Sequence, residues 1–414
     1  MMGDKIPELR FNGFEDKWEE HLFKDFTKLS QGLQIAIDKR FTEPGKNREF
    51  YITNEFLKPE SKTRYYIESP SINVVANKED VLMTRTGNTG EIVTDVKGAF
   101  HNNFFKIDYC RTVVKKNFLY YFLNSSRIQK EILARAGSST IPDLNHNDFY
   151  KIVAFLPSLA EQNKIGYLFK ELDQSINYEQ QKLKKLKQLK LAMLQKMFPK
   201  EGEKIPEIRF NGFEGDWDEA LLGECGETYT GLSGKTKNDF GHGNAEYVTY
   251  LSVFNNPILY KNGTDRIEID SNQNEVMFGD VIFTISSETP GEVGMASVWH
   301  QKRKNIYLNS FCFGYRPQEE FNNFYLGYVL RTNLVRSQFI KLAQGVSRYN
   351  ISKHKAMNIE FPITSIKEQE KIGKFFKELD ENITSHQNKL KKLKQFKQAM
   401  LQKMFVANEG RSNN

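Results

Sequence analysis

At 414 residues, with 39% apolar and 13% aromatic side chains, the chain is long enough for two or three domains with substantial cores. It has no apolar run near the ~18 residues of a membrane helix and no signal-peptide pattern, which favours a cytoplasmic protein. Three scattered cysteines (Cys110, Cys225 and Cys312) suit neither a disulfide framework nor a zinc site, and the net charge of +7 weakly favours an anionic partner.

An internal repeat frames each half of the chain. Residues 5–15 recur almost unchanged as 204–214, and a tryptophan follows each copy. Residues 161–198 recur as 368–405, with 27 of 38 positions identical. The middles do not align at a glance, and the second is eight residues longer. Matching ends with different middles favour a common structural frame that carries two domains with different binding specificities. A recent duplication under unequal constraint is the alternative.

The repeat predicts seven segments along the chain. They are an N-terminal repeat segment (1–20), a first variable domain (21–158), a first long helix (159–199), a second copy of the N-terminal segment (200–219), a second variable domain (220–362), a second long helix (363–405) and a disordered tail (406–414).

The first middle, residues 21–158, combines strand-like runs with a helical stretch and carries 20 basic against 15 acidic residues. Strands are expected at 72–76, 81–84 and 151–156, and a helix at 118–136. An acid-led strand enters a polar glycine turn at 79–90, and a small polar loop covers 136–140. Basic and aromatic residues interleave, a mixture that suits phosphate contact together with base-edge reading.

The repeated block predicts a long helix in each copy. Apolar residues at steps of four and three form a heptad seam from Ile165 to Met197 and from Ile372 to Met404. A helix of 38 residues rises ~57 Å and needs a partner for its seam, and the other copy is the obvious one.

Polar residues interrupt the seam at matching places and suggest how the two helices pair. They are Glu179 and Lys190 in the first copy and His386 and Lys397 in the second. Antiparallel pairing is predicted, because it brings the central Glu179 and His386 together and separates the two lysines. The alternative is that the interruptions merely face solvent. Each copy has a net charge of +4, and its lysines could face phosphate, an acidic partner or water.

The second middle, residues 220–362, is neutral, with 14 basic and 14 acidic residues. Strands are expected at 247–253, 281–285 and 359–363, and a helix at 321–343. The order of features repeats that of the first middle, with a glycine turn at 279–291 and a polar loop at 344–349. The middles therefore read as two α/β domains of one fold with different loops, and loops on a rigid frame usually carry specificity.

Catalytic motifs are missing from the sequence. The segment 231–236 resembles a phosphate-binding loop, but Tyr229 stands where that motif needs its first glycine. Neither the HExxH motif of metalloproteases, the GxSxG motif of serine hydrolases nor a CxxC pair occurs. We therefore expect a protein that is not itself an enzyme.

Three features coincide: the Pro-Glu-Leu/Ile-Arg-Phe opening before a tryptophan, variable α/β middles, and Lys/Leu-rich helices that end in Met-Leu-Gln-Lys-Met-Phe. Together they resemble the DNA-specificity subunit of type I restriction-modification systems, over nearly the whole chain. The resemblance implies an α/β (α+β) fold in which two target-recognition domains are joined by two helices packed as an antiparallel coiled coil, with a pseudo-twofold repeat. Each domain would read half of a bipartite double-stranded DNA target, and the coiled coil would set the spacing.

The resemblance also implies partners and cofactors. Two adenine methyltransferase subunits would bind the frame and hold S-adenosylmethionine. Restriction subunits, where present, would use ATP and Mg. This chain itself would bind no cofactor.

Family members differ in their base-contacting residues, so candidate DNA contacts rest on loop position and chemistry alone. They are Lys39, Arg40, Lys46, Arg48, Lys62, Arg64, Tyr65, Tyr66, Arg85, Thr86, Asn88, Ser138, Ser139, Thr140, Lys235, Lys237, Thr284, Ser286, Ser287, Gln344, Ser347, Arg348 and Tyr349.

Two other functions stay open. A coiled-coil adaptor between two proteins predicts no sequence-specific DNA binding, and an enzyme with an unrecognised site predicts turnover by the isolated chain.

Overall fold

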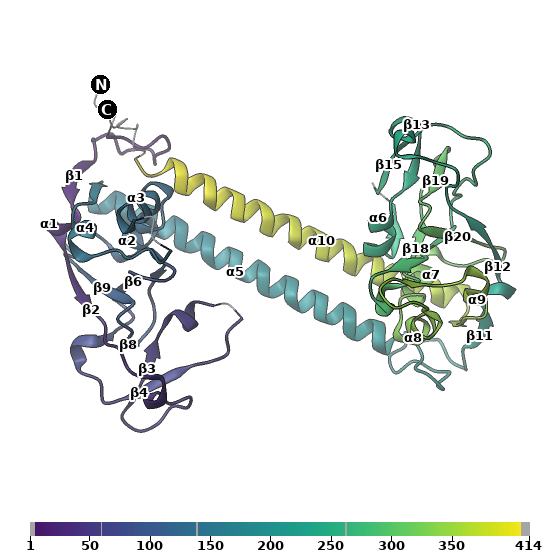
Figure 1. Cartoon of the computed structure of the whole chain (residues 1–414), viewed down its shortest axis with the longest axis horizontal. Helices are drawn as coiled ribbons and strands as arrows, with labels where there is room; N and C mark the ends of the chain where they lie inside the picture. The colour runs from purple at the N-terminus through teal and green to yellow at the C-terminus, as the bar shows by residue number, and fades with distance from the viewer. Residues whose placement is uncertain (1–4, 59, 138–139, 261–262, 407–414) are drawn as a thin grey trace. The chain divides into compact units, whose positions relative to one another are not determined.

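The computed structural model describes residues 5–58, 60–137, 140–260 and 263–406. The chain divides into two compact units, unit 1 (Met1–Gln180 with Asn388–Asn414) and unit 2 (Gln181–Gln387). Two helices of 38 residues each, α5 (Leu159–Lys196) and α10 (Ile366–Lys403), have one half in each unit (Figure 1). Each unit therefore contains a variable middle and half of each long helix.

Unit 1 contains two four-stranded sheets, ordered β2-β9-β6-β7 and β4-β3-β8-β5, and an antiparallel pair of β1 with β10. Its strands are β1 (Glu19–Leu22), β2 (Thr27–Gln31), β3 (Arg48–Ile52), β4 (Tyr65–Glu68), β5 (Val75–Ala76), β6 (Val81–Thr84), β7 (Ile92–Val93), β8 (Gly98–Phe100), β9 (Phe104–Tyr109) and β10 (Val153–Leu156). Its helices, besides halves of α5 and α10, are α1 (Phe23–Phe26), α2 (Lys116–Leu123), α3 (Ser126–Ala136) and α4 (His146–Tyr150), with 3₁₀ turns η1 (Ile37–Lys39), η2 (Asn54–Leu57) and η3 (Ile72–Val74).

Unit 2 contains a five-stranded sheet ordered β12-β20-β16-β18-β14, a three-stranded sheet ordered β15-β13-β19, and the pairs β11-β22 and β17-β21. Its strands are β11 (Asp218–Leu221), β12 (Gly226–Thr230), β13 (Phe240–Val248), β14 (Ile258–Leu259), β15 (Thr264–Ile267), β16 (Val281–Thr284), β17 (Ser286–Ser287), β18 (Ala296–Trp299), β19 (Ile306–Leu308), β20 (Cys312–Pro317), β21 (Tyr349–Asn350) and β22 (Glu360–Ile363). Its further helices are α6 (Tyr250–Asn255), α7 (Asn323–Val329), α8 (Asn333–Leu342) and α9 (Lys353–Ala356), with 3₁₀ turns η4 (Leu222–Glu224), η5 (Lys237–Asp239) and η6 (Pro290–Glu292).

The two middles share one topology despite their different sequences. The order β2-β9-β6-β7 in unit 1 corresponds to β12-β20-β16-β18 in unit 2, and β4-β3-β8 corresponds to β15-β13-β19. In both units the second sheet joins one antiparallel and one parallel pair around its central strand. The prediction of one α/β fold used twice is confirmed.

Some predicted elements need correction. The helices expected at 118–136 and 321–343 are each broken in two, by Ser125 and by Thr332. The hydroxyl of each donates to a backbone carbonyl three residues earlier, at 2.6 and 2.7 Å, and this local bond competes with the helical ladder.

Two of the predicted strands contain another type of element. The run 72–76 begins as the 3₁₀ turn η3, and the run 247–253 leaves β13 at Val248 and enters α6. Thr249 is the residue that precedes α6, and its hydroxyl lies 2.8 Å from that of Ser252.

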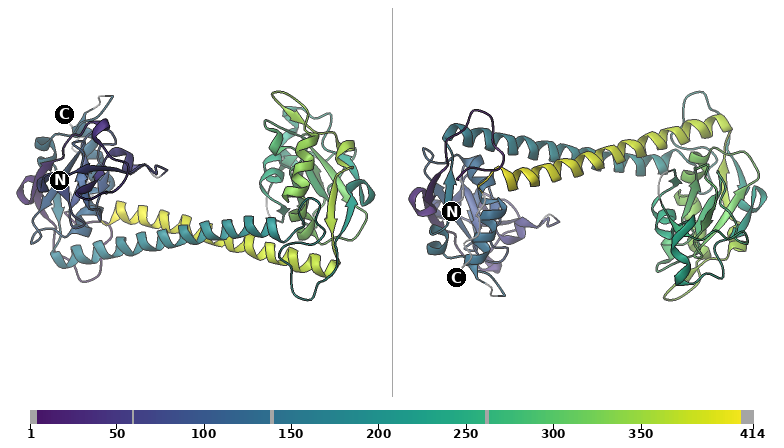
Figure 2. Two further views of the ribbon diagram at one scale, coloured as in Figure 1. Left: turned by 90° about the horizontal axis from the view of Figure 1, so that it is seen from below. Right: turned by 90° about the horizontal axis from the view of Figure 1, so that it is seen from above.

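The long helices pack antiparallel, as predicted. In unit 1 the ammonium of Lys397, near the end of α10, lies 2.5 Å from the carboxylate of Asp173, in the first half of α5. In unit 2 the roles reverse, because Lys190 of α5 lies 2.5 Å from Asp380 of α10. Figure 2 shows the paired helix halves side by side within each unit.

The other two polar interruptions of the seam lie about midway along the helices. Glu179 is 1% exposed in unit 1, and its carboxylate meets the ammonium of Lys389 at 2.6 Å. His386 is half-buried in unit 2. The predicted meeting of Glu179 with His386 joins residues of different units and stays a prediction.

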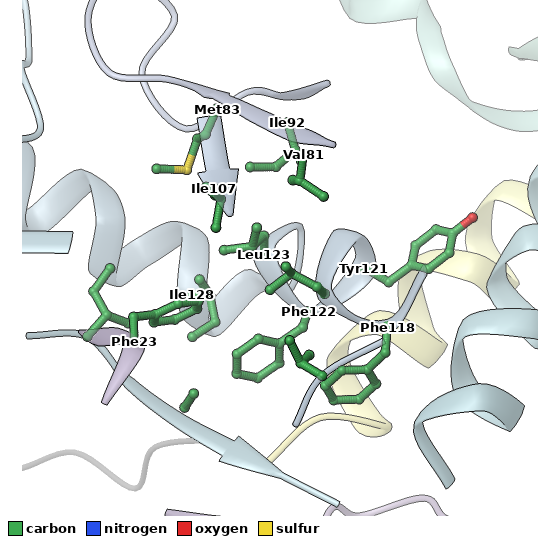
Figure 3. Packing of buried hydrophobic residues seen from close by; sticks show 14 of the residues in the cluster. Phe23, Val81, Met83, Ile92, Ile107, Phe118, Tyr121, Phe122, Leu123 and Ile128 are labelled. Atoms are coloured by element: carbon green, nitrogen blue, oxygen red, sulfur yellow. The ribbon is translucent and has the colours of Figure 1, made fainter. Parts of the chain in front are cut away.

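Each core is completed by the end of the helix that comes from the other repeat. In unit 1, sheet residues such as Met83 and Ile107 pack toward α2, where Phe118 and Phe122 lie (Figure 3). Phe405, two residues after the end of α10, joins this core. In unit 2, Phe198, two residues after the end of α5, stacks on Phe376 at 5.9 Å and meets Trp217.

The end of the described chain is packed in the same way. Val406, which the sequence assigned to a disordered tail, is 4% exposed within the core of unit 1. Residues 407–414 lie outside the described residues. No helix in the described part of the chain combines the length and the apolar character needed to cross a membrane.

Candidate nucleic-acid interface

The fold brings the two predicted specificity loops of unit 1 together. Thr86, after β6, forms an isolated antiparallel bridge with Asp143. The guanidinium of Arg85 donates to both oxygens of Asp143, at 2.9 and 2.5 Å, and Thr89 donates to the carbonyl of Pro142 at 2.7 Å. The glycine turn therefore contacts the residues that directly follow the polar loop, although more than 45 residues separate them in sequence.

The same two loops meet in unit 2 with different chemistry. Ser286 and Ser287 pair with Asn350 and Tyr349 as β17 and β21. Arg348 donates its Nε hydrogen to the Ser286 hydroxyl at 2.8 Å. Ser286, Ser287 and Arg348 line a cavity of about 500 Å³. Its lining comprises Tyr250, Leu251, Phe254, Ser286, Ser287, Glu288, Glu292, Phe311, Ser347 and Arg348.

Candidate side chains in these loops differ in their access to solvent. Asn88 and Thr140 are exposed in unit 1, as are Gln344 and Ser347 in unit 2. Tyr349 is half-buried. Ser138 and Ser139 lie outside the described residues.

Thr284 is withdrawn from the surface of unit 2. It is 0% exposed, and its hydroxyl accepts a hydrogen bond from the Met295 amide at 2.9 Å. Thr284 therefore shapes the start of the loop and presents no polar group to a ligand.

The basic and aromatic candidates at 39–66 lie apart from these loops, around the second sheet of unit 1. Three arginines there are engaged within the protein. Arg40 donates to the carbonyl of Ile35 and lies over Tyr51 and Tyr65, at 5.3 and 5.5 Å. Arg48 lies 3.4 Å from the ring centre of Phe41. Arg64 donates to the carbonyls of Ser61 and Thr63.

The other candidates around this sheet differ from the arginines. Lys39, Lys46 and Lys62 are exposed, and each is without an ion-pair partner among the residues that the structure describes. Tyr65 and Tyr66 are half-buried in β4. The lysines are therefore the available cations of this surface.

The two lysine candidates of unit 2 lie beside its three-stranded sheet. The ammonium of Lys235 meets the carboxylate of Asp270 at 2.6 Å. The hydrogen bond from Lys235 lowers the pKa of Asp270 to about 2, and the same bond raises the pKa of Lys235. Lys237 is exposed in η5. To bind a phosphate, Lys235 would have to break its ion pair with Asp270, whereas Lys237 would not have to break an ion pair with any described residue.

Sequence reasoning missed the acids and aromatic residues beside the loops. Asp143, Glu292, Phe311 and Tyr250 all contact or line the two loop surfaces. Cations indicate phosphate binding in a sequence, whereas a carboxylate near a loop carries no comparable local signal. The matched position of the loops in the two middles was the signal that could have found them.

The repeated ends form a matching set of contacts in both units. Arg10 donates twice to Glu161, at 2.7 and 2.8 Å, and Arg209 donates twice to Glu368, at 2.8 and 2.9 Å. Glu161 and Glu368 are both 0% exposed. The bond to Glu161 raises the pKa of Arg10 above its ordinary value. The arginine of the opening motif therefore fastens the N-terminal segment to the start of the long helix in each unit.

A second repeated contact ties each middle to the helix pair. The hydroxyl of Tyr121 donates to Asp173 at 2.8 Å, and that of Tyr328 donates to Asp380 at 2.7 Å. These are the same aspartates that pair with Lys397 and Lys190. Burial, reinforced by the adjacent carboxylate, raises the pKa of both tyrosines, so their hydroxyls stay protonated donors.

Comparisons with known proteins agree with this arrangement. The family model described as the type I restriction modification DNA specificity domain matches twice, at residues 15–188 and 214–395. A putative type I restriction enzyme MjaX specificity subunit from Methanocaldococcus jannaschii is 22% identical over 287 residues, which is 65% of this chain. The chain spans 62% of the length of that curated relative.

Solved structures of low sequence identity share the fold. The S subunit of a type I restriction-modification system from M. genitalium has a TM-score of 0.61 and 16% identity, and the match covers 97% of this chain and all of that one. A structure from work on complex assembly and conformational transition of the type I R-M system has a TM-score of 0.53 and 18% identity, covering 95% and 99%. With two family-model matches that together cover most of its length, the chain belongs to the type I restriction modification DNA specificity domain family.

Proposed function

We propose that this chain is the non-catalytic DNA-recognition subunit of a type I restriction-modification complex. Unit 1, through the middle 21–158, reads one half of a bipartite target, and unit 2, through the middle 220–362, reads the other. The observation that carries this proposal is that one fold, used twice, presents different side chains at the same loop surface: Arg85 paired with Asp143 in unit 1, and Arg348 held by Ser286 in unit 2.

The exposed candidates of each loop surface would make the contacts with DNA. In unit 1 these are Asn88 and Thr140, beside the half-buried Thr86 and supported by the lysines of the second sheet. In unit 2 they are Gln344, Ser347 and Arg348. Lysines position a protein on the phosphate backbone, whereas polar side chains in the grooves read bases. The positive middle of unit 1 is expected to supply more of the non-specific affinity than the neutral middle of unit 2.

Two methyltransferase subunits are proposed to bind the repeated frame. Apolar side chains are exposed at matching positions in both units: Ile6 and Ile205, Leu9 and Ile208, Leu189 and Phe396. The amide of Leu9 donates to the carbonyl of Lys403 at the end of α10, and the amide of Ile208 donates to that of Lys196 at the end of α5. The same surface presented twice suits one partner bound twice.

The chemistry of the complex is assigned to the partners. The methyltransferase subunits would bind S-adenosylmethionine and methylate adenine, and restriction subunits, where present, would use ATP and Mg. Within the described residues, His, Cys, Asp and Glu form no group that could hold a metal ion. The proposed role of this chain is to bind, orient and space the target.

Competition binding by the assembled complex tests the function. The full chain, purified with its methyltransferase subunits, is titrated with duplexes that carry or lack the host's methylated sequence. We expect binding to the cognate duplex to be at least ~10³-fold tighter than to a scrambled one at physiological salt. Equal affinity for both duplexes would remove the recognition role and favour an adaptor between two proteins.

A further inference from the structure

We propose that Arg348 reads a guanine through its major-groove edge, and that Glu292 accepts a hydrogen bond from the cytosine paired with it. The site is the cavity of unit 2 between β17, α6 and the loop before β21. This inference rests on the proposed function, because it requires DNA against the loop surface. Beyond the proposed function, the inference names one base pair of the target, G·C, and the two side chains that recognise it.

Arg348 is held in position before any ligand arrives. Its Nε donates to the hydroxyl of Ser286, which is 5% exposed, and its guanidinium lies 5.2 Å from the ring centre of Phe311. The carbonyl of Ser286 in turn accepts the Tyr250 hydroxyl at 2.6 Å. The two terminal nitrogens of Arg348 make no hydrogen bond to the residues that the structure describes. They form the paired donor that matches O6 and N7 of guanine.

The acids in the cavity favour a base edge over a phosphate. Glu292 lines the cavity, and one of its oxygens accepts the Ser287 hydroxyl at 2.9 Å. Glu288 lines the same cavity and is exposed. Two carboxylates beside one arginine repel a phosphate. A G·C pair, however, presents two acceptors on guanine and the N4 amine donor on cytosine in the major groove, which matches an arginine beside a carboxylate.

In unit 1, the arginine at the corresponding loop surface is paired with an acid. There the loops hold Arg85, whose Nε and one terminal nitrogen donate to Asp143. The position of Asp143 corresponds to that of Asn350 in unit 2, because Asp143 pairs with Thr86, the second residue after β6, and Asn350 pairs with Ser286, the second residue after β16. Asp143 binds one edge of the Arg85 guanidinium and neutralises its charge, whereas Arg348 has no ion-pair partner among the residues that the structure describes, so the guanine contact is proposed for unit 2.

The test measures binding of the assembled complex to duplexes with single modified bases. Each guanine of the methylated target is replaced in turn by 7-deazaguanine, which lacks the N7 acceptor, or by inosine, which keeps O6 and N7. For the wild-type complex we expect one 7-deazaguanine position to weaken binding about 5- to 150-fold, while inosine at that position has no effect. In the Arg348→Ala complex the same 7-deazaguanine is expected to cause no further loss.

Two further variants separate the guanine contact from charge alone. Arg348→Lys keeps the charge but not the paired donors, so it is expected to behave as Arg348→Ala does at that position. Arg266→Ala removes an exposed arginine from β15 of the same unit and is expected to keep the wild-type response to 7-deazaguanine. Glu292→Ala is expected to relax the requirement for the same base pair.

The outcomes separate the two claims. If the wild-type complex prefers its target but Arg348→Ala keeps the full response at every guanine, the inference is overturned and the proposed function stands. A loss of affinity in Arg348→Ala that is equal for all sequences would mark a phosphate contact and also overturn it. If the wild-type complex has no sequence preference at all, both claims fail together.

Discussion

At the scale of single residues, the frame depends on a few buried side chains that recur in both units. The carboxylate of Glu161 is fully buried and receives two hydrogen bonds from Arg10, which is itself only 11% exposed. A buried ion pair stabilises little compared with apolar packing, but removing one partner leaves the other charge uncompensated. The pair therefore fixes where the N-terminal segment docks.

Glu161→Gln is expected to destabilise the protein by about 3 kcal/mol, because it leaves the Arg10 guanidinium without its counter-charge. Calorimetric unfolding measures the effect. Glu378→Gln is the matched control, since Glu378 forms an exposed pair with Lys374 at 3.9 Å and should change stability by less than about 1 kcal/mol. Equal stability of the two variants would contradict a structural role for the buried pair.

Phe405→Ala is expected to lower the free energy of unfolding of unit 1 by about 3–5 kcal/mol. The reason is that the ring is 3% exposed and stacks on Phe169 at 5.9 Å. Hydrogen exchange should show faster opening of the unit 1 sheets, with the unit 2 sheets unchanged. Phe396→Ala is the control, because it removes the same type of side chain from α10, where Phe396 is 46% exposed. If both variants exchange alike, the core position of Phe405 does not matter.

For single residues, the sequence predicted where a side chain lies better than it predicted which other side chains that residue contacts. It placed Arg85 and Arg348 beside polar loops, because glycine turns and short polar runs are local signals. It could not show that Asp143 neutralises Arg85, since 58 residues separate them and only the fold brings them together. It also could not show that Thr284 is buried, because burial depends on the neighbouring strands.

At the scale of elements, the long helices were the most predictable part of the chain. Their apolar seam recurs through most of each 38-residue helix, and no proline interrupts either helix. The broken helices and the short strands could not be foreseen, because a single hydroxyl bond, such as that of Ser125 to Phe122, decides where each element ends. Antiparallel pairing could be inferred because polar residues at seam positions restrict which arrangements are possible.

Inserting one heptad into each long helix, between Gln180 and Gln181 and between Gln387 and Asn388, is expected to widen the gap between the two DNA half-sites. Seven residues add ~10 Å of helix, which corresponds to about three base pairs at ~3.4 Å each. Sequencing of the methylated motif in cells carrying the variant measures the gap. Inserting the heptad in α5 alone is the control, because it leaves the added turns unpaired. An unchanged gap in the double insertion contradicts the spacing role of the helices.

At the scale of the whole molecule, the repeat separates what stays constant from what varies. The constant ends supply Arg10, Glu161 and their counterparts Arg209 and Glu368, while the middles supply the loop surfaces. Because the two middles share one topology, we expect that a middle can be exchanged if the incoming one keeps the tyrosine that contacts the long helix.

Replacing residues 220–362 with the middle of another family member is therefore expected to change one half of the recognised sequence and leave the other half unchanged. Tyr328 must be matched by a tyrosine in the incoming middle, because it donates to Asp380 of α10. The methylated motif of the chimaera measures the result. A change in both halves would count against two independent readers.

The most direct test of DNA recognition is a map of adenine methylation across the host genome, with and without this gene. The proposed function predicts that methylation disappears from a single motif of two short parts separated by a fixed gap, and that restoring the gene restores it. Persistence of every methylated motif after deletion, in a host that expresses the complex, would contradict the assignment of this chain as the subunit that recognises DNA.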